Sequence, residues 1–261
     1  MLTTIAIIPA RMASSRFPGK PLKPIVGMPM VGHVYKRTKM SGVDAVYVAT
    51  YDQAIKDYVE SIGGQAVLLQ EKFERPTECT AAALQEIERA TGETIKNILM
   101  IQGDEPVIFP ETVNDLAAAV SQRASGVVNI VNNIRDRQIF LDKNIVKAVL
   151  DQQGRIIWFF RLPSLFWQER IDELTSVKIQ TGIIGFKREA LLSYAMLKST
   201  DFEKVNSVDM FRFVEHGIPV SALLSPQRLY SVDTPKDLEL VSEIMSNDPL
   251  FQKYNQHDNR G

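Results

Sequence analysis

The chain has little of what several classes of site require. Among its 261 residues there are one cysteine, Cys79, and three histidines. A single thiol excludes an intramolecular disulfide framework and a cysteine zinc site, and it is typical of a reducing compartment. The histidines, His33, His216 and His257, are far apart in the sequence and give no zinc-binding cluster. We therefore expect a cytoplasmic protein whose chemistry uses other residue types.

The sequence also lacks an excess of one charge and a long apolar run. Its 30 Lys and Arg residues balance 31 Asp and Glu residues, so no global field attracts nucleic acid or an anionic membrane. No window reaches the roughly 18 uncharged apolar residues of a membrane span. No basic segment with a long apolar run opens the chain as in a signal peptide. We expect a soluble protein with neither nucleic-acid nor membrane partners.

Short β-branched runs alternate with helical patterns over the first half of the chain. Such alternation predicts an α/β fold with a mostly parallel central sheet flanked by helices, whose ligands bind beyond the carboxyl ends of the strands. The expected strands lie at about residues 5–8, 45–49, 66–69, 98–101 and 127–131, and the expected helices at about 30–40, 53–62, 78–90 and 110–122.

This rhythm changes in the second half. Residues 145–150 and 155–160 flank the turn-like sequence Asp-Gln-Gln-Gly and are predicted to form a hairpin. We interpret residues 132–187 as a small β-rich lobe inserted into a single domain of residues 1–261, with helices returning only after residue 186. The aromatic residues around Trp158 and Trp167 form either the core of this lobe or a subunit contact. The remaining expectations are a helix at 208–216, a strand at 218–224, a helix from 233 to 245 and a polar tail over residues 246–261 that is frayed at its end.

The loop after the first strand is the most informative segment. It holds Arg11, Arg16 and Lys20 together with Ser14, Ser15 and a glycine. Three cations and the backbone N–H groups of such a loop can face several phosphate oxygens at once, which predicts a triphosphate site. The loop is not an ATP-binding P-loop, which has glycine where this chain has alanine and no proline after its lysine. The alternative is a solvated surface connection.

Two separated aspartates are candidate metal ligands. Asp104 follows a buried strand in the sequence Gln102-Gly-Asp-Glu-Pro, and Asp233 precedes a helix. Carboxylate oxygens are the ligands that Mg²⁺ prefers. The alternatives are a turn aspartate at position 104 and a helix N-cap at position 233. We interpret Glu105 as a local structural acid.

These segments resemble the signature of the sugar-activating nucleotidyltransferases with a Rossmann-like core, in particular the 3-deoxy-manno-octulosonate (Kdo) cytidylyltransferases, which make CMP-Kdo. The match rests on residues 5–22, 46–50, 101–106 and 231–238, which occur in the family's order. The resemblance implies the family's Rossmann-like fold and a nucleotidyltransferase that joins CTP to a small acidic sugar and releases pyrophosphate. It also implies Mg²⁺ as cofactor and a homodimer.

The resemblance further implies a role for each matching residue. Lys147 also matches the family, or it is simply exposed on the hairpin, and Arg161 is either a sugar contact or a lobe-surface arginine. The implied set is Lys20, Arg11 and Asp104 for catalysis; Pro9, Ala10, Arg11, Ser14, Arg16, Lys20, Thr77 and Gln102 for the nucleotide; Arg161, Gln180, Glu203 and Asn206 for the sugar; and Asp104 and Asp233 for the metal.

Three departures from the family pattern lie in the nucleotide and sugar regions. Residues 75–79 read Arg-Pro-Thr-Glu-Cys where the family has Ser-Gly-Thr-Asp/Glu-Arg, Gln180 replaces a histidine, and Tyr51 replaces an aspartate. The acceptor is therefore Kdo, an amino or deoxy relative, or another 2-keto-3-deoxy sugar acid. Two other interpretations stay open: a nucleotidyltransferase for another sugar or sugar phosphate with a different NTP, and a non-catalytic nucleotide-sugar binding protein.

Overall fold

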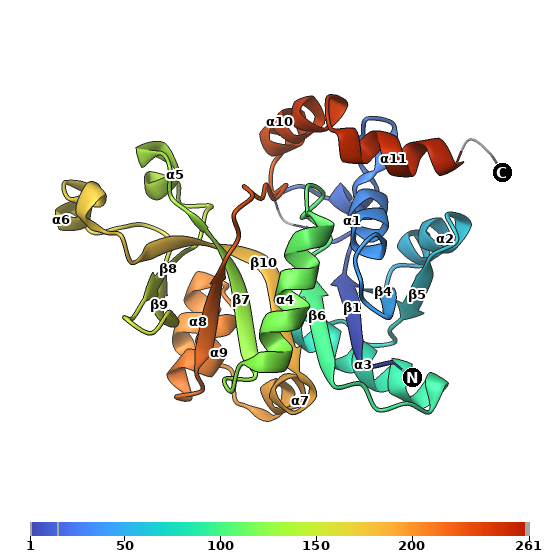
Figure 1. Cartoon of the computed structure of the whole chain (residues 1–261), viewed down its shortest axis with the longest axis horizontal. Helices are drawn as coiled ribbons and strands as arrows, with labels where there is room; N and C mark the ends of the chain where they lie inside the picture. The colour runs from blue at the N-terminus through green and yellow to red at the C-terminus, as the bar shows by residue number, and fades with distance from the viewer. Residues whose placement is uncertain (1, 15, 259–261) are drawn as a thin grey trace.

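A computed structural model of the chain describes residues 2–14 and 16–258 and contains a nine-stranded sheet between two layers of helices (Figure 1). The strand order is β5-β4-β1-β6-β10-β7-β11-β9-β8, and a two-stranded hairpin, β2-β3, lies apart from it. The strands are β1 Thr4–Pro9, β2 Pro24–Ile25, β3 Met28–Pro29, β4 Ala45–Thr50, β5 Gln65–Leu68, β6 Asn97–Ile101, β7 Val127–Asn133, β8 Lys147–Leu150, β9 Arg155–Phe160, β10 Val177–Lys187 and β11 Val220–Leu224.

Helices cover both faces of the central strands, which explains why β1 and β6 are apolar on both faces. Successive side chains of β1 point to opposite faces: Ile5 and Ile7 belong to one core, Ala6 and Ile8 to the other. The first core is closed by α3 (Pro76–Thr91), α7 (Arg188–Met196) and α9 (Met210–Glu215), the second by α1 (Met30–Lys39), α2 (Gln53–Ser61) and α4 (Pro110–Gln122). The expected α/β fold is confirmed, and β5, β4, β1 and β6 are parallel.

The expected inserted lobe is only partly separate. β10 runs antiparallel between β6 and β7, in the middle of the sheet, and β8 and β9 extend the same sheet. The reason is the apolar content of β10, whose Ile183, Ile184 and Phe186 are fully buried. What projects from the end of the molecule is the β8–β9 hairpin with the short helices α5 (Arg137–Leu141) and α6 (Leu165–Gln168) (Figure 1). These helices precede residue 186, which corrects the expectation that helices return only after that residue.

Most of the aromatic residues in this projecting part form its own core. The ring of Phe160 lies 6.0 Å from that of Phe140 and 5.2 Å from that of Trp167. Trp158 packs against Phe211 in the main core. The interpretation of the aromatic residues as a lobe core is therefore correct for Phe160 and Trp167, whereas Trp158 also contacts the main core.

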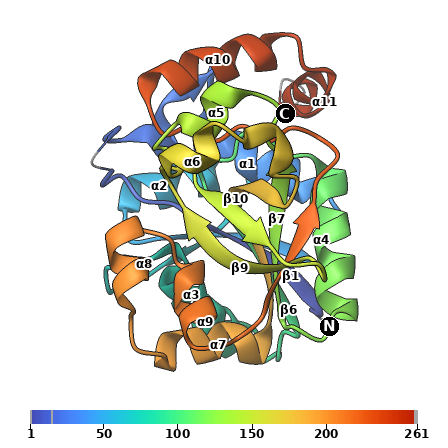
Figure 2. The ribbon, with the colours of Figure 1, turned by 90° about the vertical axis from the view of Figure 1, so that its left-hand side faces the viewer.

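The C-terminal segment is helical where the structure describes it. α10 (Pro235–Ser246) and α11 (Pro249–Asp258) lie along one end of the molecule, and α11 packs on α1 (Figures 1 and 2). Tyr254 is buried and its hydroxyl lies 2.7 Å from Nδ1 of His33, while Arg37 pairs with Asp248. Burial lowers the pKa of His33 to about 4, so its ring is neutral and structural. Phe251 and Tyr254, three residues apart in a polar sequence, are the buried side chains that anchor α11. Residues 259–261, the end of the tail, lie outside the described part.

None of the helices in the described part of the chain combines the length and the apolar character that a membrane span requires.

Candidate active site

A cleft of about 950 Å³ opens where β1 and β6 end. This is the edge of a parallel sheet at which α/β proteins bind ligands. Residues from both halves of the chain line it, and most of the residues implied by the family resemblance are among them: Pro9, Ala10, Arg11, Ser14, Arg16, Lys20, Gln102, Asp104, Arg161, Gln180 and Asp233.

Lys20 joins the two separated aspartates. Its Nζ donates to Oδ2 of Asp104 at 2.6 Å, to Oδ1 of Asp233 at 3.1 Å and to the carbonyl of Val232 at 2.9 Å. Burial alone would lower the pKa of Lys20, but the two carboxylates outweigh it and raise the pKa, so the ammonium stays charged. Gly19 precedes Lys20 with φ +73°, a left-handed conformation that glycine adopts without strain. The basic loop and both aspartates therefore converge on one point.

Asp233 is free for this contact because its neighbour caps the helix. Thr234 forms a capping box with Asp237 at the start of α10. The carboxylate of Asp233 instead receives the ammonium of Lys20 and the guanidinium of Arg16, whose Nη2 lies 3.0 Å from Oδ1. The N-cap interpretation of Asp233 is wrong. Asp104 likewise faces Lys20, and its carbonyl accepts from the N–H of Val232 at 2.8 Å, which holds the two segments together.

The ends of β1, β6 and β10 are locked to one another beside the aspartates. The N–H of Gly103 donates to the carbonyl of Pro9 at 3.2 Å, and a Cβ on Gly103 would lie 3.1 Å from that of Ala10. Glu105 is buried, and its Oε1 accepts from the N–H of Gly182 at 2.9 Å. Burial and the neighbouring Asp104 raise the pKa of Glu105 to about 8. Its contacts are with the backbone, as expected of a structural acid.

The basic loop is held by two further contacts. Arg11 Nη1 donates to the carbonyls of Phe73 and Glu74 at 3.2 and 3.3 Å, and so connects the loop to the segment before α3. The N–H of Met12 donates to Oδ2 of Asp52 at 2.7 Å. Ser15 lies outside the described residues. The loop thus keeps its cations at the rim of the cleft.

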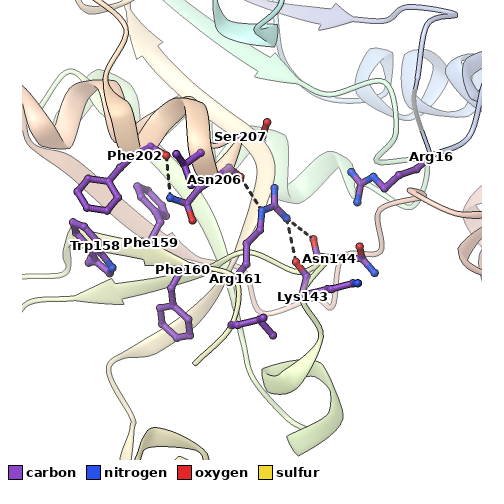
Figure 3. A pocket seen from close by; sticks show the side chains of 12 residues that line it. Arg16, Lys143, Asn144, Trp158, Phe159, Phe160, Arg161, Phe202, Asn206 and Ser207 are labelled. Carbon is purple, nitrogen blue, oxygen red and sulfur yellow. Dashed lines mark hydrogen bonds between the residues drawn. The ribbon is translucent and has the colours of Figure 1, made fainter. Parts of the chain in front are cut away.

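Arg161, which follows β9, lines the cleft and also, together with Arg16, the adjoining pocket shown in Figure 3. Its Nε donates to the carbonyl of Asn206 at 2.8 Å, and its Nη1 to those of Lys143 and Asn144 at 3.4 and 3.0 Å. Burial, with a contribution from Arg16, lowers the pKa of Arg161. Among the described residues no acceptor takes a hydrogen bond from Nη2, and no carboxylate lies within ion-pair distance of Arg161. Asn206 supplies only its carbonyl, because its side-chain amide donates to Phe202.

The hydrogen bonds around Gln180 fix the polarity of its amide. Asn129 Nδ2 donates to the carbonyls of Ile130, Thr181 and Ile183 at 3.0–3.2 Å, so Asn129 Oδ1 is the acceptor that remains. Gln180 Nε2 donates to it at 3.0 Å. The Oε1 of Gln180, which receives no hydrogen bond from the described residues, is then an acceptor available to a hydroxyl or ammonium group.

Thr77 and Glu203 do not lie at the cleft, which corrects two expectations. Thr77 is buried, and its hydroxyl donates to Oδ2 of Asp209 at 2.7 Å. Both oxygens of Glu203 are bound by Arg212, at 2.6 and 2.8 Å, and also accept from Tyr194 and Thr200. The Thr77 hydroxyl and both Glu203 oxygens therefore bind groups inside the protein, away from the cleft.

A stability measurement distinguishes the internal role of Glu203 from sugar binding. Glu203→Gln is expected to cost about 3 kcal/mol or more, because it leaves Arg212 buried with a weakened partner set. For a chain of this size that lowers Tm by about 6 °C or more. Glu60→Gln, which breaks only the exposed pair with Lys56, is the control and should cost below about 1 kcal/mol. An unchanged Tm with a raised acceptor KM would contradict the structural assignment of Glu203.

Sequence reasoning did not single out the residues that position the site. Asn129 orients Gln180, Asp52 anchors the basic loop and Asp209 holds the start of α3 through Thr77. Asn129 carried a detectable signal, since it interrupts the β-branched run Val-Val-Asn-Ile-Val. Asp52 and Asp209 carried none, because an aspartate before a helix is also typical of an ordinary cap.

Comparisons with known proteins identify the family to which the chain is related. A family model described as cytidylyltransferase matches residues 5–248. The chain is 32% identical to the 3-deoxy-manno-octulosonate cytidylyltransferase of Thermodesulfovibrio yellowstonii, covering 94% of this chain and 99% of the relative. It is 35% identical to that of Myxococcus xanthus, covering 93% and 96%. A solved structure of CMP:2-keto-3-deoxy-manno-octonic acid synthetase complexed with CTP superposes with a TM-score of 0.81 at 30% identity, covering 94% of this chain and 98% of that one.

Proposed function

The chain belongs to the cytidylyltransferase family, and from this premise we propose that it transfers CMP from CTP to a 2-keto-3-deoxy sugar acid, Kdo or a close relative. A hydroxyl of the acid attacks the α-phosphorus, the bond to the bridging oxygen breaks, and pyrophosphate leaves. The need for CTP and the single buried thiol of Cys79 support a cytoplasmic location as part of this proposal.

The observation that carries the proposal is the convergence of Lys20, Asp104 and Asp233 beside a basic loop on a large cleft. Displacement at phosphorus depends on placement and charge neutralisation more than on a protein nucleophile. In the proposal, Lys20 and Arg16 neutralise the departing pyrophosphate, and Arg11 clamps phosphate oxygens from the rim of the cleft. Pro9, Ala10, Ser14 and Gln102 complete the nucleotide wall.

The paired carboxylates fit Mg²⁺. Asp104 and Asp233 share the ammonium of Lys20, which shows that their oxygens face one cation position. Among the described residues no group of three or more His, Cys, Asp or Glu side chains gathers as a metal site. A two-carboxylate set suits Mg²⁺, which keeps waters and takes phosphate oxygens to complete its shell. When bound, the ion supplies charge neutralisation at the phosphates, and Asp104 and Asp233 would hold it.

The part of the cleft around Arg161 suits an acid. Arg161 has a free Nη2 and no carboxylate partner among the described residues, so an anionic group of the acceptor would meet an uncompensated guanidinium. Gln180 offers its Oε1 to a hydroxyl or amine of the sugar. The carbonyl of Asn206 contributes by orienting Arg161.

Incubation with CTP, Mg²⁺ and a set of 2-keto-3-deoxy sugar acids, with mass detection of CMP adducts, tests the proposal. A product mass names its acceptor, and parallel reactions with ATP, GTP and UTP test the base. Formation of adducts only with a sugar phosphate, or only with another nucleotide, would overturn the assignment. Binding of CTP without any adduct would favour a non-catalytic role.

A homodimer is part of the proposal. The face formed by β9, α6 and α8 (Asp201–Asn206), which Figure 2 turns to the viewer, exposes large apolar side chains. Their exposed fractions reach 79% for Leu165, 62% for Phe166 and 84% for Val205. Several large exposed apolar side chains on one face suit an interaction surface, which a second copy of the chain would bury.

Leu165→Asp is therefore expected to convert a dimer into a monomer, because burying a carboxylate in an apolar contact is costly. Light scattering coupled to size-exclusion chromatography measures the mass. Met40→Asp, a matched change at an exposed methionine at the end of α1, should leave the mass unchanged. A wild-type chain that elutes as a monomer at all concentrations would rule out the dimer.

A further inference from the structure

Lys147 carries a buried positive charge without a counterion. Its side chain is fully buried, and within the described ranges no carboxylate oxygen lies within ion-pair distance of its Nζ. The ammonium donates instead to the carbonyls of Asp142 at 2.6 Å, Ile145 at 2.9 Å and Arg161 at 2.6 Å. Burying an ammonium is costly unless all its protons are bonded. Three protons and three carbonyls satisfy that condition.

Within the loop of residues 142–145, the two outer carbonyls accept from Lys147 and the two inner carbonyls accept from Arg161. Lys147 takes the carbonyls of residues 142, 145 and 161, while the guanidinium of Arg161 takes those of 143, 144 and 206. The loop of residues 142–145 thus accepts hydrogen bonds from both cations. Lys147 also donates to the backbone carbonyl of Arg161, whose side chain lines the cleft. Figure 3 shows the guanidinium of Arg161 between this loop and Asn206.

We propose that Lys147 is a positioning residue for the acceptor substrate: by fixing residues 142–145 against the end of β9, it holds the guanidinium of Arg161 in place for the acceptor's carboxylate. This inference rests on the proposed function. It assigns no contact between Lys147 and the substrate. It gives the buried ammonium a role in acceptor affinity and none in nucleotide binding.

The arrangement makes acceptor binding sensitive to pH. Burial lowers the pKa of Lys147, Asp142 opposes this effect and Arg161 adds to it, and together they bring the pKa to about 8. Other charged residues on the adjoining segments include Lys143 of the loop, which is exposed, Arg155 of β9, and Lys178 and Lys187 of β10. A neutral amine has two protons, so above this pKa one of the three carbonyls faces a lone pair and loses its donor. The loop is fully held below about pH 8 and loosens as the pH rises through that value.

The test measures KM for 3-deoxy-manno-octulosonate, KM for CTP and kcat from pH 6.5 to 9.5. In the wild-type enzyme the acceptor KM is expected to rise about tenfold across this range, the size of a weakened hydrogen bond to a charged group, while the CTP KM stays constant. In Lys147→Met the acceptor KM should already be raised at pH 7 and should no longer depend on pH. Lys178→Met removes a neighbouring lysine that donates to the single carbonyl of Thr175 and should retain the wild-type profile.

Three results would overturn the inference: a wild-type acceptor KM that is flat with pH, an acceptor KM unchanged in Lys147→Met, or equal increases in both KM values, which indicate general loosening. Should Lys147→Met fail to fold, the profiles of the wild type and Lys178→Met decide alone, because both must show the rise near pH 8. Failure of the proposed function is a different outcome, the absence of any CMP adduct.

Discussion

Asp104→Asn is expected to lower kcat by about 10²-fold or more, the loss that follows removal of one preorganised charged group at a reacting phosphate. The substitution keeps the shape of the side chain, and the backbone carbonyl of residue 104 still accepts from the N–H of Val232. It removes one of the two carboxylates that bind the ammonium of Lys20. Half of the negative charge that faces the cation position disappears. Affinity for Mg²⁺ should fall with it, since hard dications depend on anionic oxygen ligands.

Steady-state kinetics and the thermal shift produced by Mg²⁺ with CTP measure the two effects. A ligand that binds only the folded chain raises Tm in proportion to its affinity, so the shift should shrink in Asp104→Asn. Asp115→Asn, at an exposed position of α4, is the control and should change neither value. Normal turnover in Asp104→Asn, or a full thermal shift, would show that this carboxylate is not at the reacting centre.

The local elements could be predicted because their signals are local. The helix expected at residues 110–122 has those bounds in the structure, since proline opens it and an apolar stripe runs along it. The convergence of residues 20, 104 and 233 was predictable only in part. Strand alternation places the first two at one sheet edge, whereas Asp233 required the resemblance to a family. Its sequence context is equally typical of a helix cap, a role that Thr234 fills.

Long-range pairing explains the errors. β10 finds its place between β6 and β7, which are distant in sequence, so the insertion of an antiparallel strand into the sheet left no local trace. Glu203 and Thr77 show the same limit for side chains. The sequence does not distinguish a glutamate that faces a ligand from one that pairs with Arg212. The packing of α8 against α9 determines which of the two Glu203 does.

Lys20→Met is expected to lower kcat at least about tenfold, because the variant loses the cation that contacts the leaving pyrophosphate in the proposed mechanism. Methionine retains the length and apolar stem of lysine, so packing around η1 (Lys20–Leu22) should survive. In the substrate-free chain the same ammonium holds Asp104 and Asp233 together at 2.6 and 3.1 Å. Without it, two carboxylates face each other with only Arg16 nearby.

Because Lys20 pairs with both aspartates, its removal should lower the Tm of the substrate-free chain but increase the rise in Tm that Mg²⁺ produces. The substrate-free Lys20→Met variant should melt below the wild type, since the carboxylates repel each other. Mg²⁺ alone should then raise Tm more in the variant than in the wild type, because the ion no longer competes with the ammonium for Asp104 and Asp233. Lys23→Met, at a neighbouring exposed lysine, should match the wild type in both assays. A kcat within twofold of the wild type would mean that the triphosphate lies elsewhere, and an equal Mg²⁺ shift would mean that Lys20 does not occupy the cation position.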